Sequence, residues 1–297
     1  MLQTTEKMVN NATDTPVDDT NWDMVIRPVS GWFDIDLKAL WRYRDLIMLF
    51  VRRDFVAVYK QTILGPLWYL IQPIMTTLVF TVIFGRVAKI STDGLPPFLF
   101  YLSGVVGWRY FADCLSKTSN TFVANAGIFG KVYFPRLCIP LSVVISNLIG
   151  FGIQFALFVG FLIYYWAKGA AVHPQTAVLM LPFLMIQMAA LGLGCGIIVS
   201  SMTTKYRDLT HLVTFGVQLW MYATPIVYPT SQIPEKWQWL IALNPMAPIV
   251  EAFRYAFLGV GTVNIANIMT SIVTTIVLLA LGIVLFSRIE KSFMDTV

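Results

Sequence analysis

Long stretches without any charged residue divide the chain and determine the elements that the sequence predicts. Five such stretches lie at 61–85, 137–167, 169–204, 209–234 and 255–287, and a shorter one lies at 94–108. A charged side chain at the centre of a membrane helix costs about 2.5–3.5 kcal/mol, and a span needs about 20 apolar residues. The pattern therefore predicts an all-α membrane protein with six spans, at about 67–85, 97–115, 141–165, 177–200, 209–229 and 268–287.

The composition supports this interpretation, because 57% of the 297 residues are hydrophobic and only 12% are charged. A typical soluble domain carries about 25% charged residues, so a soluble globular enzyme and a disordered chain are both excluded for most of the length. Residues 1–30 are the exception. They are acidic, have no apolar period, and are expected to form a disordered tail.

The basic residues predict the orientation of the chain in the membrane. Most of the 21 lysines and arginines fall on one side when both ends of the chain are placed in the cytoplasm. Cytoplasmic loops are enriched in Lys and Arg. We therefore expect residues 66–290 to form the six-span domain, with the two termini, including residues 291–297, in the cytoplasm.

Residues 31–65 combine strong charge with strong hydrophobicity. Their apolar side chains recur at three- and four-residue steps, which predicts an amphipathic helix in the cytoplasmic interface of the membrane. Such a helix is either a passive anchor or a moving part at the mouth of a transport path. In the second interpretation, the candidate functional residues on its charged face are Arg44, Asp45, Arg52, Arg53, Asp54 and Lys60.

The loop at 116–137 contains the nearest match to a phosphate-binding loop. The pattern GxxxxGK[ST] would need a glycine at 125 and a serine or threonine at 132, where the chain has Asn125 and Val132. We therefore expect no nucleotide, and no other cofactor, to bind to this chain itself.

The segment 230–267 is too apolar for a solvated loop. It predicts two short helices at about 235–243 and 247–258, which dip into the outer half of the membrane and are separated at Asn244 and Pro245. Glu251 and Arg254 are three residues apart on the second helix, so their side chains are close enough to pair. The alternative is an ordinary interfacial pair with no role.

Catalytic and metal-binding patterns are absent from the sequence. The two histidines and three cysteines lack partners at ligand spacing, and no nucleophile–base pair can be assembled, so an enzyme is disfavoured. Five of the six predicted spans carry no Asp, Glu, Lys or Arg deep inside, so an ion-driven carrier is disfavoured as well. Gly192 and Gly196 have GxxxG spacing, which predicts close helix contact. The spans are rich in aromatic rings, which either form lipid-interface belts or line a path for sugar rings through Trp68, Tyr69, Tyr101, Trp108, Trp220 and Tyr222.

The order of these elements resembles that of the type-2 ATP-binding cassette (ABC) exporter permeases. Four segments look like the polysaccharide-export branch of that family: RDLIMLFVRRDFVAVYKQTILGPLWYLIQP (44–73), NAGIFGKVYFPRLCIPL (125–141), ATPIVYP (223–229) and NPMAPIVEAFRYAFLG (244–259). The similarity extends from about residue 34 to the end of the chain.

The resemblance implies a homodimer that works with two separate ATPase subunits, which bind the ATP and Mg. It implies export of lipid-linked polysaccharide, such as O-antigen, across the bacterial cytoplasmic (inner) membrane. The helix at 31–65 would be a gate helix, and Asn244, Pro245, Glu251 and Arg254 would belong to an external gate. A coupling helix would dock on the ATPase, with its contact residues among Asn125, Phe129, Lys131, Tyr133, Phe134, Pro135 and Arg136.

Within that coupling segment, Phe129, Tyr133 and Phe134 are expected to be apolar anchors, and Lys131 and Arg136 to be charges at the rim. Two other functions remain open, a teichoic-acid exporter of the same architecture and a membrane-embedded glycan-modifying enzyme. The enzyme should carry an external His or acidic cluster. In each case membrane lipids surround the chain, and no nucleic-acid partner is expected.

Overall fold

Helices account for the regular structure of this protein, as the sequence predicts. The computed structural model describes residues 37–60, 63–129, 131, 132, 134–203, 206 and 208–293, and within these ranges it contains no strand. The described residues belong to one compact unit, Ile35–Val297. The predicted tail at 1–30 and the predicted contact residue Tyr133 lie outside the described residues.

Within the described ranges, four stretches are long and apolar enough to cross a membrane by themselves: Gly65–Val87, Cys138–Ala167, Thr176–Thr203 and Ile265–Ile289. The first joins a 3₁₀ turn, helix α3 (Trp68–Phe80) and a π-helical turn (Thr81–Val87). The other three contain α6 (Cys138–Ala167), α7 (Leu181–Thr203) and most of α11 (Ile265–Phe293).

The two remaining predicted spans correspond to helices of different character. Helix α4 (Pro97–Thr118) has 22 residues but carries Arg109, Asp113 and Lys117 along its second half. Helix α8 (Leu209–Ala223) is apolar but has only 15 residues, a length of about 22 Å at 1.5 Å per residue. It ends before the predicted boundary at 229, because Thr224 precedes Pro225 and adopts extended backbone angles, as residues before proline do.

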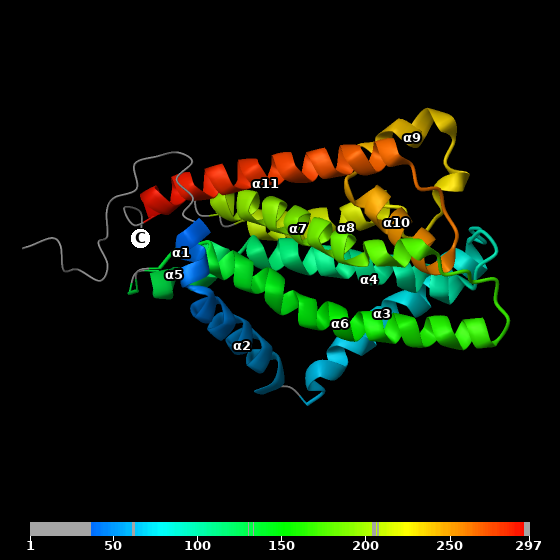
Figure 1. Ribbon diagram of the computed structural model, residues 1–297, viewed down its shortest axis with the longest axis horizontal. Helices are drawn as coiled ribbons and strands as arrows, with labels where there is room; N and C mark the ends of the chain where they lie inside the picture. The colour runs from blue at the N-terminus through cyan, green and yellow to red at the C-terminus, as the bar shows by residue number, and fades with distance from the viewer. Residues whose placement is uncertain are drawn as a thin grey trace, which may run out of the picture. The chain divides into compact units, whose positions relative to one another are not determined.

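The centre of the fold is helix α4. Every residue from Leu99 to Trp108 is buried, and α4 packs against α3, α6, α7 and the short helix α10 (Met246–Leu258). Figure 1 shows α11 running along α7. A Cβ on Gly192 would lie 2.8 Å from the Cβ of Cys114 in α4, and one on Gly196 would lie 2.6 Å from the Cβ of Thr118 in the same helix. The close helix contact predicted from the glycine spacing is therefore confirmed.

The shorter helices flank this bundle. The predicted interface helix is two pieces, α1 (Leu37–Arg42) and α2 (Arg44–Lys60), with a turn at Tyr43. Helix α5 (Thr121–Phe129) follows α4, and α9 (Glu235–Ala242) precedes α10. The two short helices predicted at 235–243 and 247–258 are thus confirmed. Figure 1 shows α9 and α10 at the opposite end of the bundle from α1 and α5.

Candidate functional site

A group of five phenylalanines joins helix α2 to α5, to the segment that precedes α6 and to α11. The ring centroid of Phe50 in α2 lies 5.7 Å from that of Phe134, and Phe134 lies 5.8 Å from Phe129 in α5. Phe129 lies 5.9 Å from Phe122, which stacks at 4.5 Å on Phe286 in α11. All five rings are buried. This phenylalanine cluster makes the predicted gate helix and the predicted coupling helix parts of one packed unit.

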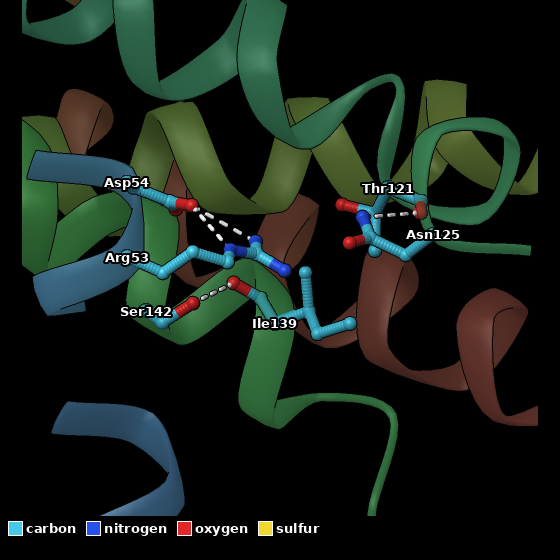
Figure 2. Close-up of polar contacts among 6 residues, drawn as sticks. All are labelled: Arg53, Asp54, Thr121, Asn125, Ile139 and Ser142. Carbon is cyan, nitrogen blue, oxygen red and sulfur yellow. Dashed lines mark hydrogen bonds and ion pairs between the residues drawn. The ribbon is translucent and has the colours of Figure 1, made fainter. Parts of the chain in front are cut away.

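Charged groups cover the cluster on two sides. The guanidinium of Arg53 lies over the Phe50 ring at 4.8 Å and donates to Asp54 at 2.9 Å, while that of buried Arg136 lies over Phe129 at 5.4 Å. Figure 2 shows Arg53 and Asp54 beside the first turns of α6. The other predicted gate charges are exposed: Arg44, Asp45, Arg52 and Lys60. Within the described part of the chain, none of them contacts a ring of the cluster.

The predicted docking anchors require a correction. Phe129 and Phe134 are each only 4% exposed and pack inside this chain, so they do not project toward a partner. Asn125 is also buried, and its side-chain amide donates to the carbonyl of Thr121 at 3.0 Å (Figure 2). Pro135 is half-buried. Among the described residues of this region, the exposed ones are Val123, Ala124, Gly127, Lys131 and Val132.

At the other end of the bundle, Asn244 connects the end of α8 to the beginning of α10. Its side-chain oxygen accepts from the indole N–H of Trp220 at 2.9 Å and from the backbone N–H of Met246 at 3.0 Å. Its side-chain nitrogen donates to the Thr224 hydroxyl at 2.9 Å and to the Ala223 carbonyl at 3.3 Å. One amide therefore fixes the turn at which Pro245 introduces α10.

Arg254 of α10 is a buried cation that packs against two other segments. It donates to the carbonyl of Ile226 at 3.1 Å, and its guanidinium lies 3.8 Å from the centroid of the Phe100 ring. A Cβ on Gly104 would lie 2.9 Å from the side chain of Ile226 and 3.2 Å from the guanidinium, so the absence of a side chain at this position gives Arg254 and Ile226 room to approach α4 closely. Burial lowers the pKa of Arg254, and the opposite charge of Glu251 raises it.

The expected contact between Glu251 and Arg254 is not formed. The two ion pairs of the described residues are both in α2, and Glu251 instead accepts a hydrogen bond from the hydroxyl of Thr230. Burial raises the pKa of Glu251, whereas the Thr230 bond and the charge of Arg254 lower it. The i, i+3 spacing is correct for a pair, but each group instead bonds to a residue distant in the sequence, Glu251 to Thr230 and Arg254 to Ile226.

The six aromatic residues predicted to line a sugar path do not share one surface within this chain. Tyr101 and Trp108 are buried, and Trp108 packs with Phe111 and Trp220 at centroid distances of 5.2 and 6.2 Å. Trp220 is partly buried. Tyr69 lies against α6, where a Cβ on Gly150 would come within 2.7 Å of its ring. The two exposed members of the set are Trp68 and Tyr222.

The family described as ABC-2 type transporter matches residues 45–258, a range that runs from α2 to the end of α10. The chain belongs to this family. One relative, an O-antigen export system permease protein RfbA from Klebsiella pneumoniae, is 31% identical over 252 residues, which is 84% of this chain and 94% of the relative. An ABC-2 family assignment also makes the chain a multi-pass membrane protein.

Two further relatives are also similar to this chain over most of its length. The O-antigen export system permease protein RfbA of Myxococcus xanthus is 26% identical over 263 residues, covering 88% of this chain and 98% of the relative. The polysialic acid transport protein KpsM of Escherichia coli is 21% identical over 234 residues, covering 78% and 89%. Both similarities extend over most of this ABC-2 transporter.

Charged residues of α4 are a feature of this ABC-2 transporter that the sequence analysis missed. Arg109, Asp113 and Lys117 recur every four residues, which places them on one helical face. Arg109 hydrogen-bonds to Gln72 of α3, and Lys117 donates to Asn147 of α6 at 2.7 Å. The sequence predicts that α4 is a span, and ionisable groups within a membrane helix normally mark functional sites. The four-residue spacing of these three charges in the sequence is the signal that could have identified them.

Proposed function

We propose that this chain is the membrane-spanning subunit of an ABC transporter that exports a lipid-linked polysaccharide, such as O-antigen, across the bacterial cytoplasmic membrane. The observation that carries the proposal is the similarity to O-antigen export permeases over 94% of a relative's length at 31% identity. The relative named for polysialic acid transport supports a polysaccharide cargo in general. ATP and Mg would bind to a separate ATPase subunit.

The geometry supports a route for the mechanical signal. The exposed surface of α5 and the following residues, Val123, Ala124, Gly127, Lys131 and Val132, would contact the ATPase. Directly beneath it, the phenylalanine cluster connects α5 to α2 through rings at 5.7–5.9 Å. Close-packed side chains transmit a displacement to their neighbours because protein interiors have low compressibility. A movement of α5 driven by the ATPase would therefore shift α2, the proposed gate helix.

The proposed assembly contains two copies of this chain and two ATPase subunits. Helix α8 supports a second copy, because it is apolar yet has no buried residue. Its large exposed side chains include Leu212, Phe215 and Leu219. In the proposed topology, α4 and α8 complete the six spans, both termini lie in the cytoplasm, and α9 and α10 lie on the external side.

Export from cells tests this function. A strain from which the gene has been deleted should lose its surface polysaccharide and accumulate lipid-linked glycan inside the membrane, and the wild-type gene should reverse both effects. The two pools are measured by gel electrophoresis of cell-surface and whole-cell glycans. Normal surface polysaccharide in the deletion strain would contradict the proposal, and loss of teichoic acid instead would identify a different cargo.

A further inference from the structure

Two adjoining cavities lie beside α10. Figure 1 shows that α10 is at the end of the bundle that carries α9. The larger has a volume of about 280 Å³ and the smaller about 130 Å³. They share Thr230, Ser231, Glu251 and Thr262 in their walls. The larger volume is close to the lower limit of small-molecule sites, which run from about 300 to 1,000 Å³. It therefore suits a ligand of one or two rings.

The larger cavity has the lining of a site for a neutral, hydroxylated ligand. Hydroxyl and amide side chains dominate its polar part, with Gln238 from α9, Asn267 from α11 and Thr262 between α10 and α11. Ile241 and Pro248 supply apolar surface. Glu251 is its one ionisable lining residue, and no lysine or arginine lines it. Phosphates and carboxylates are normally bound by Arg or Lys, so this lining disfavours an anion.

A metal ion is disfavoured by a second observation. Across the described ranges, no three His, Cys, Asp or Glu side chains gather in a group that could hold a metal. What the cavity offers is a combination of hydrogen-bonding amides, hydroxyls and one carboxylate with an apolar wall. That combination matches a sugar ring, whose hydroxyls need donors and acceptors and whose C–H faces need apolar contact.

Polar groups in this cavity are both held in place and available. The hydroxyl of Ser231 bonds to the two carboxylate oxygens of Asp93 at 3.1 and 3.2 Å, which fixes the segment that forms the wall. Glu251 accepts from Thr230 through one oxygen. Within the described part of the chain, no hydrogen bond involves the side chain of Asn267 or the second oxygen of Glu251. A preformed wall with unused hydrogen-bonding groups lowers the entropic cost of binding.

We propose that the larger cavity is a binding site for one neutral sugar residue, with Asn267 and Gln238 donating to its hydroxyls, Glu251 accepting from one, and Ile241 and Pro248 contacting its C–H face. The ligand in the cell is a residue of the exported glycan, so the assignment of the source rests on the proposed function. The site lies at the opposite end of the bundle from the phenylalanine cluster, where the polymer would leave the proposed path.

Direct binding is measured on the purified full-length chain in nanodiscs by saturation-transfer NMR. The probes are D-glucose, D-galactose and D-mannose, with glycerol and D-glucose 6-phosphate as comparison ligands. We expect transfer to at least one neutral sugar, and weaker transfer to glycerol and to the phosphorylated sugar. No transfer to any of the three sugars, or equal transfer to glycerol or to the phosphorylated sugar, would overturn the site.

Three substitutions assign the signal to the cavity. Asn267→Ala should weaken binding about fivefold, as expected for one lost hydrogen bond. Ile241→Trp should abolish it by filling the space without removing a polar group. Thr270→Ala, which removes an exposed hydroxyl one turn away on α11, is the matched control and should bind normally. Unchanged binding in both cavity variants, with normal thermal stability, contradicts the proposal.

Surface polysaccharide in cells separates this inference from the proposed function. If the wild-type chain restores export and Ile241→Trp lowers it while Thr270→Ala does not, the sugar belongs to the cargo. If the wild-type chain restores export and Ile241→Trp leaves it intact, the cargo assignment of the site is wrong and the proposed function stands. If the wild-type chain supports no export although the purified chain binds sugar, the proposed function fails and the cavity remains a sugar site.

Discussion

Arg254 places a positive charge inside the fold, where its side chain is almost completely buried. Its guanidinium lies over the Phe100 ring and donates to the Ile226 carbonyl, and its Nε has no hydrogen-bond partner among the described residues. A cation over an aromatic face contributes up to about 2 kcal/mol when desolvated. The side chain thus fastens α10 to α4 and to the segment that follows α8.

The exchange Arg254→Met tests this role. It retains apolar volume but leaves the buried Ile226 carbonyl unpaired, which costs about 1–3 kcal/mol. We expect the purified variant to have a lower thermal midpoint. The midpoint is measured from the loss of the monodisperse gel-filtration peak as the protein is heated. Lys236→Met, at an exposed position on α9, is the control and should keep the wild-type midpoint. Equal midpoints for the two variants would show that Arg254 is not a fastening group.

Also at the scale of single residues, Phe134 and Val132 are two positions apart in the sequence but differ greatly in exposure. Phe134 is 4% exposed, inside the phenylalanine cluster, whereas Val132 is 59% exposed. Phe134→Ala should destabilise the permease by about 3–5 kcal/mol, the usual cost of a buried Phe→Ala exchange. Val132→Asp should leave the thermal midpoint unchanged but lower co-purification of the ATPase.

Val263→Asp, in the loop between α10 and α11, is the control for the added charge. Both aspartate variants are purified with a tagged ATPase, and its recovery is compared with wild type. Full recovery with Val132→Asp would remove this surface from the proposed docking site.

At the scale of elements, the contact between α7 and α11 depends on two glycines that face each other. A Cβ on Gly194 would lie 2.8 Å from the Leu279 nitrogen, and one on Gly282 would lie 2.8 Å from the Gly194 carbonyl oxygen. Both obstacles are backbone atoms, which no side-chain rotation can move. Backbone contact of this kind is how membrane helices gain packing energy where lipid supplies no hydrophobic driving force.

Alanine at two helical glycines should therefore have opposite effects. Gly194→Ala forces α7 and α11 apart and should lower the thermal midpoint. Gly160→Ala, in α6, adds a Cβ with nothing within 4 Å and should be neutral or stabilising, because alanine favours a helix over glycine by about 1 kcal/mol. Thermal melts of both variants in one detergent measure this difference, and destabilisation of equal size would contradict it.

The elements that the sequence predicted well are those marked by local signals. Charge gaps located the long helices, and the break at Asn244 and Pro245 separated α9 from α10. The side-chain contacts within the chain were harder to predict. The spacing of Glu251 and Arg254 pointed to a local pair, but the partners of Arg254 come from α4 and from the segment after α8. The inward orientation of Phe129 and Phe134 likewise depends on α2 and α11, which lie far away in the sequence.

At the scale of the whole molecule, the proposed division of labour assigns no chemistry to this chain. The sequence departs from the phosphate-loop pattern at both Asn125 and Val132, and the structure places Asn125 on α5 with its side chain bonded to Thr121. A loop that cradles phosphates with its backbone N–H groups cannot form where those groups are engaged in a helix.

The purified permease should therefore hydrolyse no ATP by itself, and hydrolysis should begin when the ATPase is added. Phosphate release is measured for each subunit and for the mixture. A preparation from cells that carry the empty vector gives the contaminant background. Turnover above that background by the permease alone would show a nucleotide site that the proposed division of labour excludes.

The position of Asn244 directly before Pro245 also affects the chemical stability of the protein. Asparagine side chains slowly deamidate when the backbone nitrogen of the next residue attacks the carbonyl carbon of the side-chain amide. Here the next residue is Pro245, whose nitrogen carries no hydrogen, so that attack is blocked. Conversion to aspartate would replace the donor that bonds to Thr224 and Ala223 with an acceptor. The amide that connects α8 to α10 is thus chemically protected against the slow damage that would separate them.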